Sequence, residues 1–236
     1  MSLFNLQNIW YNFYGDNMAS VLIHICVAKK VKEKMNLKVN EKDYILGSMA
    51  PDIAKQIGEN KAKSHFIFDG TDIPNIKYFL DKYDIETSFD LGYLVHLYTD
   101  KYFYGGFLDK LVSDTEIKLL DGTIVPSQNI DVRNIIYNDY TNINIDLIDA
   151  YDLDLSIFYE DFIIPKSKIE EIPLDKLDIL LEKIGIIIEN TKKEPAYIFD
   201  MYTIHNFIED CTNRIIGDLS GRKIDWVRKK NWKIRK

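Results

Sequence analysis

The chain has 236 residues, enough for one large domain or two small ones, with 46% hydrophobic and 28% charged residues. This composition is typical of a soluble globular protein. Glycine (11) and proline (6) are sparse, which favours long helices over a turn-rich β architecture. The two cysteines, Cys26 and Cys211, lie in apolar helical patterns and form no CxxC zinc site, so we expect reduced core residues.

The formal net charge is −7, but the charge is uneven along the chain. Residues 222–236 carry eight lysines and arginines and one acid, Asp225, together with Trp226 and Trp232. This end could contact phosphate or, weakly, an anionic membrane surface, but a solvated final helix with snorkelling side chains is the favoured interpretation. The acidic remainder argues against long nucleic acid as a partner. No secretory signal is recognisable and no apolar run could span a bilayer, so we expect a cytoplasmic protein.

Helical periodicity dominates the chain. In order, we expect helices over 19–35, from Asn40 to just before Pro51, and over 73–83, 89–104, 107–120, 130–138, 143–150, 155–163, 174–192 and 195–216. The segment between Pro51 and residue 73 reads as a loop, and Gly105-Gly106 should end the strongest helix. Pro173 and Pro195 each open a helix. No strand or hairpin is expected. The prediction is a single all-α domain over 1–236, a multi-helix bundle with its core at about 19–217 and a basic C-terminal segment at 218–236.

Two histidines stand four residues ahead of a carboxylate inside expected helices. One pair is His96 with Asp100, and the other is His205 with Glu209. A separation of four places both side chains on one helical face, so each pair could bind one cation. Imidazole and carboxylate form a usual ligand set for zinc. Ordinary amphipathic helices with coincidental histidines remain the alternative, because acidic residues are common in this chain.

Further segments support a metal site. Asp52 follows a helix end in Leu46-Gly-Ser-Met-Ala-Pro-Asp52, and His65 follows in Ser64-His65-Phe66. With His24 in the first helix, all four histidines could converge if the helices bundle. Bundle cores lined by carboxylates and histidines are a known way to hold a metal cluster.

These segments, in this order, resemble the bacterial zinc-dependent phospholipase C family, distantly related to the fungal single-strand zinc nucleases. The likeness extends from about Ala19 to Gly217 and uses every histidine of the chain. It implies up to three zinc ions in one cluster. One ion would be held by Asp52, His65, His96 and Asp100. A second would be held by His205 and Glu209, and a third by His24 with Asp100 as a bridge. Asp52 would also orient the attacking water and serve as the catalytic base.

The chain departs from the family at two points. The family binds a zinc through an N-terminal tryptophan, whereas Trp10 is internal, and a further histidine expected shortly after Asp100 is absent from Lys101–Gly106. Asp139 is a candidate substitute in the second site, with helix capping as the alternative. The resemblance implies a zinc-dependent hydrolase of a phospholipid or other small phosphodiester. The alternative is a catalytically weakened or inactive helical metal-binding or interaction protein of the same fold.

Overall fold

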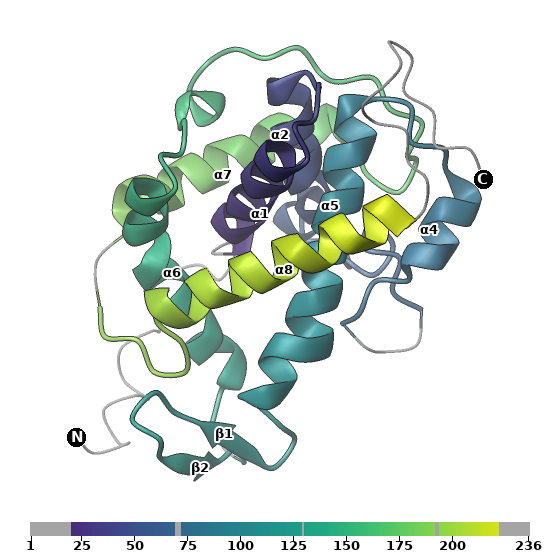
Figure 1. Ribbon diagram of the computed structural model, residues 1–236. Coiled ribbons are helices and arrows are strands. Elements are labelled where there is room, and N and C mark those ends of the chain that lie inside the picture. The colour runs from purple at the N-terminus through teal and green to yellow at the C-terminus, as the bar shows by residue number, and fades with distance from the viewer. Residues whose placement is uncertain (1–19, 69–71, 129, 192–193, 222–236) are drawn as a thin grey trace.

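The computed structural model describes residues 20–68, 72–128, 130–191 and 194–221. These residues are mostly helical (Figure 1). Their buried apolar side chains form one core cluster with members from α1 to α8. The α-helices are α1 (Ser20–Lys34), α2 (Glu41–Met49), α3 (Ile53–Gln56), α4 (Ile76–Lys82), α5 (Ser88–Tyr102), α6 (Val132–Ala150), α7 (Leu177–Asn190) and α8 (Met201–Gly221). Short 3-10 turns are η2 (Ala50–Asp52), η4 (Leu108–Lys110), η5 (Ser156–Phe158) and η6 (Leu174–Lys176), and η3 (Phe103–Phe107) is a π turn.

The centre of the molecule is the pair α2 and α5, which pack backbone against backbone. A Cβ at Gly47 would lie 2.1 Å from the carbonyl oxygen of Phe89, and one at Gly92 would lie 2.0 Å from that of Tyr44. Only glycine permits this approach. It brings the C-terminal turn of α2 against α5, and with it the Ser48 carbonyl against His96.

Local signals set the ends of these central helices. Asn40 caps α2 by accepting a hydrogen bond from the Asp43 amide, and Pro51 ends the helix within the turn η2. Thr87 and Asp90 form a reciprocal capping box at the start of α5. The predicted helices over 19–35, from Asn40, over 73–83 and over 89–104 are therefore confirmed, with small shifts at their ends.

The prediction of a helix over 107–120 and of no hairpin is wrong. Strands β1 (Glu116–Lys118) and β2 (Ile124–Pro126) pair antiparallel, and the turn between them places Gly122 at φ +85°. The hairpin lies at one end of the molecule in Figure 1. Its inward residues, Ile117 and Val125, are buried, and this burial rather than helical periodicity decides the local structure. Helix α5 ends at Tyr102, and Gly105, within the π turn η3, has non-helical backbone angles (φ −91°, ψ 20°), so the chain kinks where the glycine pair was expected to end the helix.

The second half of the chain also differs from the prediction. The two short helices expected over 130–138 and 143–150 are one helix, α6, and the helix expected over 155–163 is reduced to the turn η5. Helix α8 begins at Met201, not at Pro195, because Asp200 accepts the amide hydrogen of Thr203 as its cap. Helix α8 also continues to Gly221, so its last turn is helix rather than part of a separate segment.

The basic residues from Arg222 onward, including Trp226 and Trp232, lie outside the described residues, as does Trp10. Across the ranges that the structure covers, no helix combines the length and the apolar character needed to cross a membrane.

Candidate metal centre

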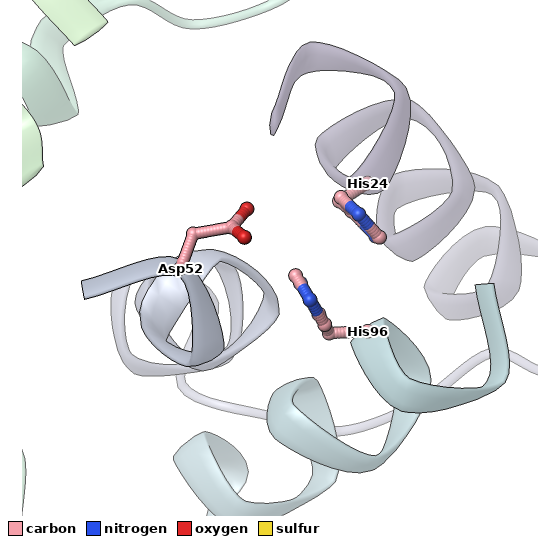
Figure 2. A group of neighbouring side chains, drawn as sticks. All are labelled: His24, Asp52 and His96. Atoms are coloured by element: carbon pink, nitrogen blue, oxygen red, sulfur yellow. The ribbon is translucent and has the colours of Figure 1, made fainter. Parts of the chain in front are cut away.

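Five side chains from four segments converge in the interior. His24 comes from α1, Asp52 from η2, His65 from the turn after α3, and His96 with Asp100 from α5. Asp52 is 8% exposed and Asp100 6%, whereas the three histidines are at most 2% exposed. Figure 2 shows Asp52 pointing toward His24 and His96, each on its own helical element.

The distances within this cluster are short. The Nε2 atom of His65 lies 3.5 Å from Oδ1 of Asp52 and 3.3 Å from Oδ2 of Asp100. The Nε2 atom of His96 lies 3.7 Å from Oδ2 of Asp100, one turn further along α5, as the spacing of four predicts. His24 places its Nε2 3.2 Å from Oδ1 of Asp100 and stacks on His96 with ring centroids 3.8 Å apart.

A backbone carbonyl fixes the protonation of the His96 ring. Nδ1 of His96 donates to the Ser48 carbonyl at 2.8 Å, and a carbonyl only accepts, so this ring presents a bare Nε2. Nδ1 of His65 lies 3.0 Å from both the Lys61 carbonyl and the Ser64 hydroxyl. The Nε2 atoms of the two rings face each other at 3.1 Å. Such backbone partners are the usual way of orienting a metal-binding histidine.

Two further polar atoms belong to the same cluster. Nδ1 of His24 and Oδ2 of Asp52 are buried and have no hydrogen-bond partner among the described residues. A buried polar atom without a partner costs free energy, about 1–3 kcal/mol. Together with the facing Nε2 atoms, these orphaned atoms indicate a group that the protein itself does not provide.

The charges of the cluster are mutually dependent. Burial alone would raise the pKa of Asp52 and Asp100, but hydrogen bonds and charges of the neighbouring histidines hold both well below the ordinary value. Burial, aided by the charge of His24, lowers the pKa of His96 to about 3. The carboxylates are therefore ionised and His96 is neutral at pH 7. Buried anionic oxygens beside imidazole nitrogens make a binding site for a cation.

The cluster contains two overlapping groups whose ligand atoms all lie within 4.8 Å of one another. One is His24, Asp52 and His96, and the other is His65, His96 and Asp100. Because Ser48 occupies Nδ1 of His96, that residue offers a single nitrogen to both groups. The residues therefore fit one fully ligated ion. A second ion would have only His24 and a bridging oxygen of Asp100 as ligands, so it would bind much more weakly.

His205 and Glu209 do not join this cluster, contrary to the expected second zinc site. His205 is exposed on α8 and its Nδ1 contacts the Tyr151 hydroxyl at 3.0 Å. Glu209 forms ion pairs with Lys30 and Lys34, and these pairs lower its pKa. The separation of four residues does place His205 and Glu209 one turn apart on α8. At Glu209, however, this helix faces lysines of α1 and not the cluster.

Asp139 is not a substitute ligand. Its carboxylate is completely buried and accepts the amide hydrogens of Tyr197, Ile198 and Phe199 at 2.9, 2.6 and 3.1 Å. Burial raises the pKa of Asp139 while these amides act in the opposite direction. It fixes the segment before α8, a structural role close to the capping alternative.

A small cavity of about 10 Å³ borders the cluster and is lined by His24, Asp100, Tyr104 and Tyr140, among others. It has room for about one water molecule. A larger cavity of about 280 Å³, between Tyr102, Phe107 and Arg214, contains none of the five cluster residues.

Sequence reasoning missed two residues that shape the centre, Ser48 and Lys61. Ser48 acts through its backbone carbonyl, which has no sequence signature. Lys61 stands four residues before His65, and its carbonyl accepts the amide hydrogen of that histidine and lies 3.0 Å from its Nδ1. Tyr93 of α5 donates its hydroxyl hydrogen to the Ser64 carbonyl and so ties this turn to the central helices.

Comparisons of the chain with protein-family models, curated proteins and solved structures find no match. The fold and the buried histidine–aspartate cluster are thus the observations on which a function can be argued.

Proposed function

We propose that this protein is a zinc-dependent phosphoester hydrolase that resembles the bacterial zinc-dependent phospholipases C. One observation carries the proposal: five buried ligands from four segments converge with their acceptor atoms turned inward. Nitrogen and carboxylate ligands in a compact set suit zinc better than calcium or magnesium, which prefer all-oxygen sites.

The residues of the centre would have two roles, metal binding and orientation of the attacking water. His65, His96 and Asp100 would hold the ion, with Asp52 at its more exposed edge. A zinc ion held by these residues would supply a bound water with a pKa near 7 and a positive charge for a phosphoryl oxygen. Oδ2 of Asp52 has no hydrogen-bond partner among the described residues, so this ionised carboxylate would orient the attacking water as its proton passes to solvent. The water oxygen then bonds to phosphorus, the bond from phosphorus to the leaving oxygen breaks, and solvent protonates that oxygen.

The substrate class follows from the chemistry of the ligand set and the resemblance. A phospholipid headgroup or another small phosphodiester would present the phosphoryl oxygens that this centre can polarise.

The test begins with purified full-length protein. Elemental analysis should find about one tightly held zinc per chain, since the cluster offers one complete ligand set. A soluble chromogenic phosphodiester should be hydrolysed, chelator should abolish the activity, and added zinc should restore it. Short-chain phosphatidylcholine, assayed alongside, distinguishes a lipid from a general phosphodiester substrate. Protein that binds no zinc, or that shows full activity in chelator, would contradict the proposal.

A second candidate is a metal-binding protein without turnover. The fit to a single complete ion and the one-water cavity favour it, because phosphoesterases often use two ions about 4 Å apart. Stoichiometric zinc without hydrolysis of any tested ester would establish this alternative.

A further inference from the structure

We propose that Lys61 is the phosphate-binding residue of this centre and supplies the positive charge that a second metal ion would otherwise provide. The inference rests on the proposed function, since it concerns the anion that the zinc-loaded site would accept.

The centre is buried, and its least buried residues are the carboxylates. The three histidines are at most 2% exposed, whereas Asp52 is 8% and Asp100 6% exposed. The adjoining cavity holds about one water, so a phosphate group cannot enter it and must approach over this carboxylate edge. Two aspartates repel such an anion, and one zinc ion only neutralises them. A second cation is therefore needed at this edge.

Lys61 lies where that cation is needed. It stands one helical turn before His65, whose ring it fixes through its own carbonyl. Its ammonium group lies 4.7 Å above the centre of the Tyr104 ring, and Tyr104 lines the small cavity together with Asp100 and His24. The side chain is 28% exposed, so it is held in place and can still reach solvent.

Asp72 and Tyr104 position the Lys61 ammonium group and leave some of its hydrogens available to a ligand. Its Nζ contacts Oδ1 of Asp72 at 2.9 Å and also lies over the face of the Tyr104 ring. Three donor hydrogens are available on an ammonium, so a phosphoryl oxygen can bind beside Asp72. Burial tends to lower the pKa of Lys61, but the negative charge of Asp100 and the bond to Asp72 raise it, which is consistent with its position beside the cluster.

The test measures binding of inorganic phosphate by equilibrium dialysis. The protein carries stoichiometric zinc and is freed of excess metal. Lys61→Met should retain its zinc and bind phosphate about tenfold more weakly or worse, because a charged hydrogen bond is lost. Lys61→Arg should recover much of the affinity. The backbone carbonyl that orients His65 is unchanged in both variants, so the metal centre should stay intact.

Lys77→Met is the matched control. Lys77 also pairs with an aspartate, Asp81, but its side chain is 81% exposed on α4 and has no contact with the cluster residues. Its phosphate affinity should equal that of the wild type. Metal-free wild-type protein should bind no phosphate, because two bare carboxylates then face the anion.

The outcomes separate the two proposals. Absence of zinc in the wild type would end the hydrolase proposal itself. Zinc-loaded wild type that binds no phosphate, or Lys61→Met that binds it as well as the wild type, would overturn the role of Lys61 alone. Hydrolysis of a soluble phosphodiester should fall in Lys61→Met in step with phosphate binding. If Lys61→Met lowered hydrolysis only with phosphatidylcholine vesicles, Lys61 would act by contacting the lipid surface, and the role proposed here would be wrong.

Discussion

The Nε2 atoms of His65 and His96 face each other at 3.1 Å, while Nδ1 of each ring lies within 3.0 Å of a backbone carbonyl oxygen. The neutral His96 ring donates its one hydrogen to Ser48 and turns a bare Nε2 toward His65, so a proton or a cation between the two nitrogens would satisfy it. The carboxylates of Asp52 and Asp100 close the same space. This relationship makes His96 the most informative residue to change, since it belongs to both ligand groups.

Replacing His96 with alanine should abolish tight zinc binding. In the wild type, zinc at a hundredfold excess over its dissociation constant should stabilise the fold by about 2.7 kcal/mol, because the ion binds only the folded state. His96→Ala should lose this increment. The measurement is thermal unfolding with and without zinc, together with zinc content.

His205→Ala provides the control for that experiment. His205 is exposed and bonds to Tyr151, so its loss should leave zinc content and zinc-dependent stabilisation unchanged. A comparable loss of zinc in both variants would show that the ion does not occupy the cluster described here.

The crossing of α2 and α5 should be intolerant of any side chain. Gly92→Ala would place a methyl group against the Tyr44 carbonyl and push the helices apart, at a cost of about 3 kcal/mol. Zinc affinity should also fall, because the Ser48 carbonyl would move from Nδ1 of His96. Chemical unfolding and zinc titration measure the two effects.

Gly217→Ala tests whether the Gly92 effect is specific to the crossing. Gly217 lies within α8, and nothing lies within 4 Å of an added methyl group. This substitution should stabilise the protein by about 0.5–1 kcal/mol, because alanine loses less backbone entropy in a helix. Equal destabilisation by both changes would refute the close-approach explanation.

The central part of the fold and site could be predicted because the relevant signals are local. Asn40 and Thr87 cap their helices through neighbouring amides, and His96 and Asp100 share a face by spacing alone. The structure also brings His24, Asp52 and His65 into this group.

The remaining parts depend on contacts between distant segments, which spacing does not encode. Glu209 has the same spacing from His205 as Asp100 has from His96, yet the lysines of α1 pair with it on the surface. The strands at 116–126 are too short for a periodic signal and form because Ile117 and Val125 become buried together. The late start of α8 depends on Asp139, some 60 residues earlier, which binds the amides of the preceding segment.

Asp139→Ala should therefore affect stability and leave the metal centre intact. Three amides, two of them buried and that of Tyr197 half-buried, would lose their acceptor, at a cost of about 2–4 kcal/mol. Asp139→Asn keeps one oxygen acceptor and should cost less. Zinc content per folded molecule should match the wild type in both. Selective loss of zinc from a folded Asp139→Ala protein would instead restore this residue as a ligand.

The cap of α8 should produce a defined pH dependence. Asp200 accepts hydrogen bonds from the amide and hydroxyl of Thr203 at 2.9 and 2.7 Å. Burial acts to raise the pKa of Asp200, but these bonds outweigh it and lower the pKa below its ordinary value. A carboxylate with a lowered pKa stabilises the fold fully above the pKa of the unfolded chain, about 3.9, and loses that contribution as the pH falls through the folded value.

Asp200→Ala should accordingly cost about 1 kcal/mol at pH 7, the usual value of an N-cap. The difference from the wild type should shrink as the pH falls below about 4, because the wild-type carboxylate then becomes protonated. Asp200→Asn keeps a side-chain oxygen that cannot titrate, so it should retain most of the stability at pH 7 and lack this part of the acid dependence. Urea unfolding of the three proteins between pH 3 and pH 7 measures the effect. A gap between wild type and Asp200→Ala that stayed constant over this range would show that the charge of Asp200 does not contribute to the cap.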